Sequence, residues 1–376
     1  MTKTKDITRL IVAASENDPD MLYATRFFAP DPFIFLEQDG KRTLVLSDLE
    51  IDRGRKQAEA DEILPYSVFE KEVQGTSTRA PAYEKVLAHF LTKRKVRAAV
   101  VPANFPLGFA RELEAKKIRL RPTNGLFWPE REAKTAAELR LMRKALEITE
   151  AGMARGIAVL KRAKPGRAQR LEWSGAVLTS EILRAEIDTA VLRAGGLPAN
   201  TIVAGGDQAC DPHERGHGPL QANSLIIIDI FPRSAANGYY GDLTRTVVRG
   251  RASEEQRRLW ETVNQGQALA LKKMKPGVDG LKLHKEVKQF FTDRGYPTEV
   301  RNGRQTGFFH GTGHGLGLEI HEFPRFQKTV FKPGQVLTVE PGLYYPGLGG
   351  TRTEDVVAIT KRGIRMLSRC ENRLEI

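Results

Sequence analysis

Short apolar and polar runs alternate over the first third of the chain and predict a small domain of strands and helices. Residues 33–36 and 43–46 are β-rich, and Asp39-Gly40 between them is a strong signal for a hairpin turn. Residues 98–101 predict another strand, and apolar residues at helical spacing predict a helix over 83–91. Turn-forming residues near position 125 interrupt this pattern, so we assign residues 1–125 to an N-terminal α/β domain.

A second domain is predicted for residues 126–376. Thr135 and Glu138 have the spacing of a capping box, and the apolar residues that follow predict a long amphipathic helix towards Leu160. Beyond residue 200, apolar strand-like runs alternate with Gly-rich turns, at 201–203, 225–228, 246–248 and 336–339. Helical patterns intervene at 254–271 and 280–294. This order is typical of an α+β domain built around a largely antiparallel sheet.

Composition narrows the class of protein. Hydrophobic residues make up 40% and charged residues 28% of the 376 residues, which is a globular balance. The net charge of +13 is spread over many segments without a recognised nucleic-acid motif, so we interpret it as a solvated basic surface and expect no nucleic-acid partner. The apolar run at 10–14 is too short for a signal peptide or a membrane span. We therefore expect a cytoplasmic protein without membrane contact.

The two cysteines add little chemistry. Cys210 and Cys370 form no CxxC pair, so neither a disulfide framework nor a zinc ribbon is indicated. Cys210 lies close to His213 in the sequence, but no supporting motif surrounds it. We interpret Cys210 as a small buried thiol rather than a nucleophile.

Four carboxylates stand out by their positions next to predicted strands. Asp229 follows the run 225–228, and Glu340 follows 336–339. Asp242 precedes Leu-Thr-Arg-Thr, and Glu354 precedes a Val-Val pair. Unpaired carboxylates at the ends of buried strands are costly, and several together repel one another unless cations neutralise them. Hard oxygen ligands with one imidazole suit Mn, Co, Zn or Fe.

Histidines cluster in the same part of the chain. His310, His314 and His321 are three of the seven histidines, and they lie within twelve residues. His310 and His314 belong to a glycine-rich segment, where glycine lets the backbone pass close to a crowded site. A single histidine is more often a satisfied core residue than a ligand, but three in such a loop favour a functional site.

The motifs in order resemble those of the pita-bread metallopeptidases, and among them the Xaa-Pro peptidases, prolidase and aminopeptidase P. The resemblance covers roughly residues 135–376, and the smaller domain before it resembles the creatinase-like N-terminal domain of the same families. It rests on these segments: Asp229, Gly-Tyr-Tyr-Gly-Asp242-Leu-Thr-Arg-Thr, Gly-His314-Gly-Leu-Gly, His321-Glu-Phe-Pro-Arg325, Val-Glu340-Pro-Gly-Leu-Tyr and Thr-Arg352-Thr-Glu354-Asp.

The resemblance implies a role for each matching position. The implied ligands of two divalent metal ions are Asp229, Asp242, His314, Glu340 and Glu354, with Asp242 and Glu354 bridging the ions. Glu340 would also pass a proton, and Arg352 would contact a ligand carboxylate. His310 and His321 would line the substrate side and stabilise the tetrahedral intermediate. His213 would take the place of the family's further active-site histidine.

The implied reaction is hydrolysis of an Xaa-Pro bond in a dipeptide or short peptide. We expect manganese, with cobalt or zinc as alternatives, and a homodimer. Arg325 matches an arginine that prolidases place near the substrate carboxylate, which favours Xaa-Pro dipeptidase activity. Aminopeptidase P activity on longer peptides is the alternative, and a non-catalytic binding protein of the same fold is a more remote one.

Two local features leave alternatives open. Residues 213–217 read His-Glu-Arg-Gly-His, the HExxH pattern of zinc proteases, but Pro212 and Gly216 disfavour the helix that this pattern requires. The same stretch leaves open whether His213 or His217 takes the family histidine's place, and we favour His213. Asp229 and Asp242 are also farther apart than in related sequences, which predicts a longer turn around residues 233–237.

Overall fold

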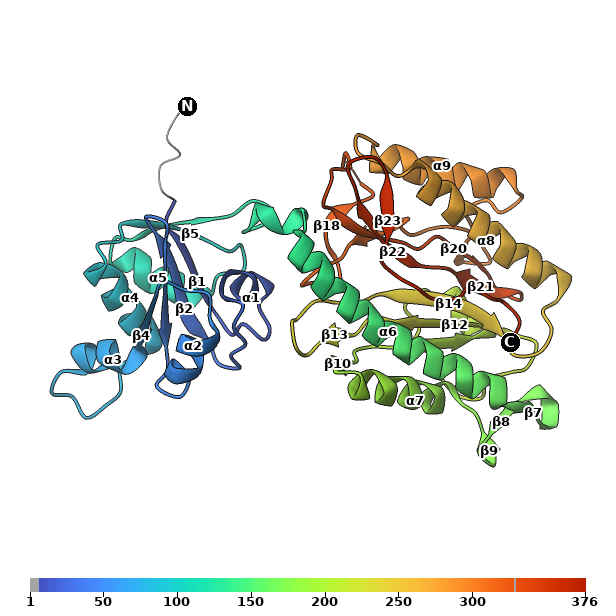
Figure 1. The fold of residues 1–376 in the computed structure, drawn as a ribbon, viewed down its shortest axis with the longest axis horizontal. Coiled ribbons are helices and arrows are strands. Elements are labelled where there is room, and N and C mark those ends of the chain that lie inside the picture. The colour runs from blue at the N-terminus through green and yellow to red at the C-terminus, as the bar shows by residue number, and fades with distance from the viewer. Residues whose placement is uncertain (1–6, 328) are drawn as a thin grey trace. The chain divides into compact units, whose positions relative to one another are not determined.

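The computed structural model describes residues 7–327 and 329–376. The chain forms two compact units that divide after Arg131. Each unit has its own sheets, helices and hydrophobic core (Figure 1).

The first unit contains a sheet with strand order β4-β3-β2-β1-β5-β6. Its strands are β1 Arg9–Ala13, β2 Phe33–Gln38, β3 Lys41–Leu46, β4 Glu62–Pro65, β5 Ala98–Val101 and β6 Arg119–Pro122. The three central strands pair antiparallel, and the outer strands pair parallel. Asp39 and Gly40, with φ of 52° and 76°, form the two-residue turn between β2 and β3, which confirms the predicted hairpin.

Helices cover both faces of this sheet: α1 Pro19–Thr25, α2 Ile51–Gln57, α3 Tyr66–Gln74, α4 Tyr83–Lys93 and α5 Leu107–Ala115. Successive side chains of a strand point to opposite faces, so β1 and β2 contribute to two separate cores. Leu10 and Ile34 pack with α4 on one side, whereas Ile11 packs with Phe127 and Trp128 on the other.

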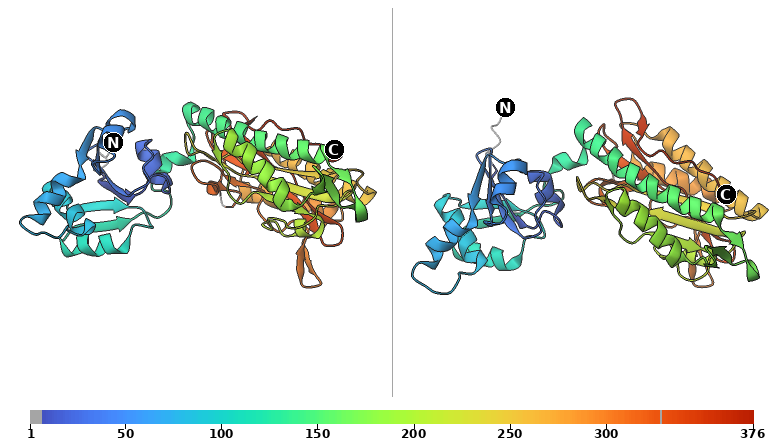
Figure 2. Two further views of the ribbon diagram at one scale, coloured as in Figure 1. Left: turned by 90° about the horizontal axis from the view of Figure 1, so that it is seen from below. Right: turned by 60° about the horizontal axis from the view of Figure 1, so that its bottom comes forward.

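The second unit begins with α6 Ala136–Arg162, which starts with the capping box that Thr135 and Glu138 predict. Together with α7 Ser180–Arg193, this helix packs on the strands β11 Ile202–Gly205, β12 Leu225–Ile230 and β14 Leu243–Val248 (Figures 1 and 2). These strands pair antiparallel in the order β11-β12-β14. Ile187 and Val191 of α7 join Ile226 and Ile228 of β12 in a fully buried core.

A second antiparallel sheet has the order β18-β17-β19-β22-β23. Its strands are β17 His314–Gly315, β18 Glu322–Arg325, β19 Val336–Val339, β22 Asp355–Ile359 and β23 Ile364–Met366. Helices α8 Glu254–Lys273 and α9 Gly280–Asp293 pack on it through residues such as Val263 and Phe291 (Figure 1). In the hairpin of β20 Gly342–Tyr345 and β21 Gly349–Arg352, β21 contacts β12 and β14 of the first sheet, and both strands contact α8.

Shorter elements complete the chain: β7 Lys164–Pro165, β8 Leu171–Trp173, β9 Ala176–Val177, β10 Gly196–Leu197, β13 Arg233–Ser234, β15 Glu299–Arg301, β16 Arg304–Thr306 and the 3-10 helices Pro129–Glu132, Arg167–Gln169 and Gly206–Cys210. The turn expected around residues 233–237 includes β13, which pairs with β10. No helix in the described part of the chain is both long enough and apolar enough to cross a membrane.

Candidate metal centre

The second unit holds a cavity of about 810 Å³ that is lined by all five predicted ligand residues. One ligand atom each from Asp242, His314 and Glu354 lies within 4.8 Å of the others. Asp229 and Glu340 line the same cavity. The carboxylates and the imidazole therefore come together from five separate segments of the chain.

The two aspartates are placed by neighbouring antiparallel strands. Asp229 lies within β12, opposite Thr244 of β14, and Asp242 immediately precedes β14. Gly241 brings this segment against α6, because a Cβ at this position would stand 2.6 Å from the carbonyl oxygen of Ala145. No larger residue fits at position 241, so the close approach of this segment to α6 fixes the position of Asp242 just before β14.

His314 and Glu340 come from adjacent strands of the second sheet. A Cβ at Gly313 would stand 2.0 Å from the carbonyl oxygen of Thr338, so glycine lets the His314 loop approach β19. Glu340 follows β19, and its backbone N–H donates to the carbonyl of Thr312 at 2.8 Å. Nε2 of His314 thereby lies 3.3 Å from Oε1 of Glu340.

Glu354 lies between β21 and β22, where the strand pairing is interrupted. Its backbone N–H donates to the carbonyl of Thr244 at 3.1 Å, and the Thr244 hydroxyl donates to its Oε2 at 2.8 Å. Two contacts from one residue of β14 thus hold both the main chain and the carboxylate of Glu354.

Burial and mutual repulsion change the protonation of these acids. Desolvation, followed by the negative charges of Glu354, Asp229 and Glu340, raises the pKa of Asp242 well above its usual value. Desolvation is also the main cause that raises the pKa of Glu354, and it raises the pKa of Glu340 to about 7. Four acids in one cavity, three of them buried and Glu340 partly exposed, cannot all ionise without compensating positive charge.

The donor set fits metal cations. Nδ1 of His314 lies 3.0 Å from the carbonyl oxygen of Gly315, so Nδ1 carries the proton. Desolvation lowers the pKa of His314 to about 4, which leaves Nε2 with a lone pair that faces Glu340 and, at 3.6 Å, Asp242. Oδ1 of Asp229 is buried and has no hydrogen-bond partner among the described residues. A lone pair and carboxylate oxygens directed at one another are the arrangement that a divalent cation stabilises.

Arg352 and Tyr344 connect this set to His310. Nη2 of Arg352 donates to Oδ2 of Asp229 at 2.7 Å, and Nη1 donates to the Tyr344 hydroxyl at 3.1 Å. His310 has Nδ1 2.9 Å from the carbonyl of Gly311 and Nε2 2.8 Å from the Tyr344 hydroxyl. Since a carbonyl only accepts, Nδ1 of His310 is the protonated nitrogen, and Nε2 accepts from the tyrosine. In this arrangement His310 has no N–H left to donate to a substrate.

His321 and Arg325 also line the cavity. Burial, with a further contribution from His314, lowers the pKa of His321 to about 4, and the two rings meet edge to face at 4.4 Å. The buried Lys134 pairs with Glu322 at 2.5 Å and so holds β18, which follows His321 and ends at Arg325. Arg325 itself makes no side-chain hydrogen bond or ion pair with any described residue.

The two histidines of the HExxH pattern lie in different surroundings. His213 lines the cavity, whereas His217 is an exposed residue near Glu214 and does not. Residues 213–217 are not helical, as Pro212 and Gly216 predicted. The segment therefore cannot place both histidines on one helical face, and His213 is the one that reaches the site.

Sequence reasoning assigned no role to several residues of the cavity and its surroundings. These are Asn200, Ile202, Arg215, Phe231, Phe309, Ile320, Phe326 and Gln327 in the wall, and Thr244, Arg245 and Tyr344 behind it. Tyr344, Thr244 and Arg245 belong to the motifs quoted above, and this membership was the only sequence signal of a contribution to the site. The apolar wall residues carry no signal, because their side chains are indistinguishable from core residues in the sequence.

The sequence profile of Metallopeptidase family M24 matches residues 140–361. The Xaa-Pro dipeptidase of Pyrococcus furiosus is 33% identical over 246 residues, which span 64% of this chain and 64% of that protein. The Xaa-Pro dipeptidase of Pyrococcus horikoshii is 27% identical over 322 residues, which span 83% of this chain and 84% of that protein.

Solved structures show a likeness along the full chain. The X-Pro aminopeptidase of Thermotoga maritima superposes with a TM-score of 0.82 at 22% identity and covers 99% of this chain and 98% of its own. The prolidase of Pyrococcus horikoshii superposes with a TM-score of 0.78 at 25% identity and covers 100% of this chain and 97% of its own.

Proposed function

The chain belongs to metallopeptidase family M24 and has the pita-bread fold, and from that premise we propose that it hydrolyses the Xaa-Pro bond of dipeptides. The observation that carries this proposal is a single cavity whose lining includes both the cation Arg325 and the ligand set Asp229, Asp242, His314, Glu340 and Glu354. Two divalent ions held by this set would activate a water molecule and polarise the scissile carbonyl. Manganese is the ion we expect.

The residues around the ions supply binding and proton transfer. His321 is uncharged at neutral pH and keeps one ring N–H, which can donate to the oxygen of the scissile carbonyl as negative charge develops there. His310, whose two nitrogens are engaged, instead holds the Tyr344 hydroxyl in place beside Arg352. We assign the donation to substrate to His321 alone, which narrows the pair of donors expected from the sequence.

Glu340 is suited to carry a proton during the reaction. Burial raises the pKa of Glu340 to about 7 in the metal-free chain, so its carboxyl group can hold a proton near neutral pH, and bound ions would favour release of that proton. Thr338 donates to its Oε1 at 3.2 Å and fixes its orientation. The imide nitrogen of proline has no N–H and must gain a proton to leave, which Glu340 can provide.

The cavity wall offers a surface for the proline ring. Ile202, Phe231 and Phe309 line it with apolar side chains that belong to one cluster, and His213 is also among the lining residues. A peptide that ends in proline cannot be recognised through its imide nitrogen, so recognition must use the ring and the carboxylate. Arg325, which has no protein partner among the described residues, is available to bind that carboxylate with two parallel N–H groups.

Aminopeptidase P activity is the second candidate, because the Thermotoga maritima structure with this fold is an X-Pro aminopeptidase. Product analysis separates the two. The purified chain, loaded with Mn²⁺, is incubated with an Xaa-Pro dipeptide and with the matching Xaa-Pro-Yaa tripeptide. We expect a higher kcat/KM for the dipeptide. Faster release of the first residue from the tripeptide would establish the aminopeptidase instead. A homodimer and a cytoplasmic location stay predictions.

A further inference from the structure

Arg245 is a buried cation directly behind the predicted metal ligands, and its side chain lies on the far side of β14 from the cavity lining. It is 2% exposed, and it follows Thr244, whose hydroxyl binds the carboxylate of Glu354. The position is not among the residues that line the cavity. Arg245 therefore does not contact a substrate in the cavity, and any effect on the metal centre passes through the residues that it contacts.

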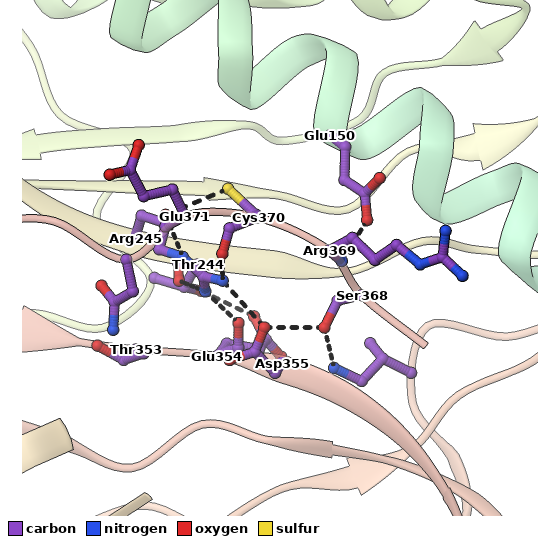
Figure 3. A network of polar contacts seen from close by, with 12 residues as sticks. Glu150, Thr244, Arg245, Thr353, Glu354, Asp355, Ser368, Arg369, Cys370 and Glu371 are labelled. Carbon is purple, nitrogen blue, oxygen red and sulfur yellow. Dashed lines mark hydrogen bonds and ion pairs between the residues drawn. The ribbon is translucent and has the colours of Figure 1, made fainter. Parts of the chain in front are cut away.

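Every N–H group of this guanidinium has a partner (Figure 3). Nη1 donates to the carbonyls of Thr244 at 2.9 Å and Glu354 at 2.6 Å. Nη2 donates to Oδ1 of Asp355 at 2.9 Å and to the carbonyl of Cys370 at 2.9 Å, and Nε donates to the carbonyl of Glu371 at 3.2 Å. A guanidinium has five N–H donors in one plane, and all five are used here.

The contact with the Glu354 carbonyl matters because Glu354 lies outside the strand ladder. Residues 353 and 354 separate β21 from β22 and belong to neither strand, so their main chain lacks the hydrogen bonds of a strand ladder. The carbonyl oxygen of Glu354 receives its hydrogen bond from Arg245 and its N–H donates to Thr244. A buried carbonyl that lost this partner would be costly, so the arginine fixes the main chain from which the Glu354 carboxylate projects.

Arg245 also ties the C-terminal segment 367–371 to the same place. Ser368 donates its hydroxyl to Oδ1 of Asp355 at 2.8 Å and accepts from the N–H of Val356 at 3.1 Å. On the other side, the N–H of Arg369 donates to Glu150 of α6 at 2.6 Å (Figure 3). The C-terminal segment is thereby fastened to α6, to β22 and, through Arg245, to the residue that carries the Glu354 carboxylate.

We propose that Arg245 is a positioning residue of the metal centre, which fixes Glu354 by joining it to β14 and to the C-terminal segment. The inference rests on the proposed metal-binding function of Glu354. A lysine has the charge but only one point from which to donate, so it cannot span the five acceptors. Loss of a residue that holds a metal ligand typically weakens metal affinity by about 10- to 100-fold.

The chain offers a matched control in Arg249. This arginine also fastens the C-terminal end, because it donates to the carbonyls of Ile376 at 3.1 Å and Ala163 at 2.8 Å. It contacts neither Glu354 nor Asp355. Replacing either arginine by methionine removes an anchor of the C-terminal end, but only the change at Arg245 removes a partner of Glu354.

The test is titration of the metal-free full chain with Mn²⁺ in a calorimeter, alongside thermal unfolding without metal. We expect Arg245→Met to weaken Mn²⁺ binding by about 10-fold or more. Arg245→Lys should retain only part of the affinity of the unmodified chain, and Arg249→Met should lower Tm without changing the affinity for Mn²⁺. Equal affinity in folded Arg245→Met and the unmodified chain would overturn the proposal, as would equal weakening in Arg249→Met.

Two further outcomes are distinguished by the same experiment. If Arg245→Met does not fold, Arg245→Lys and Ser368→Ala take its place, and unchanged Mn²⁺ affinity in both folded variants would contradict the positioning role. If the unmodified chain itself binds no Mn²⁺, the proposed metal function fails, whatever the variants do.

Discussion

Nε2 of His314 lies 3.3 Å from Oε1 of Glu340, and the imidazole is held in the tautomer that leaves this nitrogen without a proton. Two acceptors that face each other at this distance do not attract. The contact is stabilising when Glu340 holds a proton, as it can in the metal-free chain, or when a metal cation takes the place of that proton, so this pair marks a position that an ion would occupy.

The first prediction contrasts His314 with His217. His314→Ala removes a lone pair that faces two carboxylates, so it should remove bound metal and lower turnover by several orders of magnitude. His217→Ala changes an exposed residue outside the cavity and should have little effect. Elemental analysis and kinetics on both variants check this. Metal loss in His217→Ala together with metal retention in His314→Ala would support the zinc-protease pattern instead.

The second prediction concerns Arg325. A dipeptide Xaa-Pro carries its carboxylate on the proline, whereas a longer peptide has a neutral amide there. Arg325→Ala should lower kcat/KM for dipeptides by about thirtyfold, equivalent to about 2 kcal/mol for a lost charge-assisted hydrogen bond. Xaa-Pro-Yaa tripeptides should be affected much less. Steady-state kinetics on both substrates decide the matter, and equal losses would mean that Arg325 has no part in choosing dipeptides.

The third prediction concerns the Tyr344 hydroxyl, which joins His310 to Arg352 and so to Asp229. Tyr344→Phe should lower the free energy of unfolding by about 1–2 kcal/mol, and kcat should fall because Arg352 loses a fixed partner. Tyr345→Phe is the matched control, since its hydroxyl donates to the carbonyl of Pro297 at 3.0 Å outside the cavity. Comparable kcat losses in both variants would show that the link to Asp229 is unimportant.

The fourth prediction concerns pH. Burial raises the pKa of Glu340 from 4.5 to about 7, and it also raises the pKa of Asp242 and of Glu354 well above their usual values. A raised folded-state pKa gives stability that is fully present below about 4.5 and is lost as pH rises through about 7. Metal should therefore displace protons at pH 6 and add more to Tm at pH 8 than at pH 5.

Calorimetry in two buffers of different ionisation enthalpy measures those protons. The neutral histidines contribute none, because burial lowers the pKa of His314 and His321 to about 4. Buffer-independent heats of Mn²⁺ binding at pH 6 would contradict the prediction, since they would show that the acids are already ionised in the metal-free chain.

The sequence was informative where a local signal determines structure. The Asp39-Gly40 turn and the Thr135 capping box depend on residues only a few positions apart, and both are present. The four acids drew notice because each lies beside a predicted strand. Arg245 and Tyr344 received no role, because their partners Glu354 and His310 are distant in sequence or identified only by hydrogen-bond geometry.

The state of His310 also lay beyond sequence reasoning. The family resemblance implied a donor to substrate, but the Gly311 carbonyl and the Tyr344 hydroxyl take up both nitrogens. Likewise, Phe127 and Trp128 pack in the core of the first unit, which no periodic pattern assigns to them. Packing and hydrogen-bond partners follow from tertiary structure, which short patterns do not encode.

The most direct test of the central claim is activity as a function of bound metal. The metal-free chain is titrated with Mn²⁺, and hydrolysis of an Xaa-Pro dipeptide is followed beside that of the matching Xaa-Ala dipeptide. The account predicts that Xaa-Pro hydrolysis is absent without metal, rises to a plateau as about two ions per chain bind, and exceeds Xaa-Ala hydrolysis throughout. Full Xaa-Pro hydrolysis by the metal-free chain, or none at any Mn²⁺, Co²⁺ or Zn²⁺ occupancy, would contradict it.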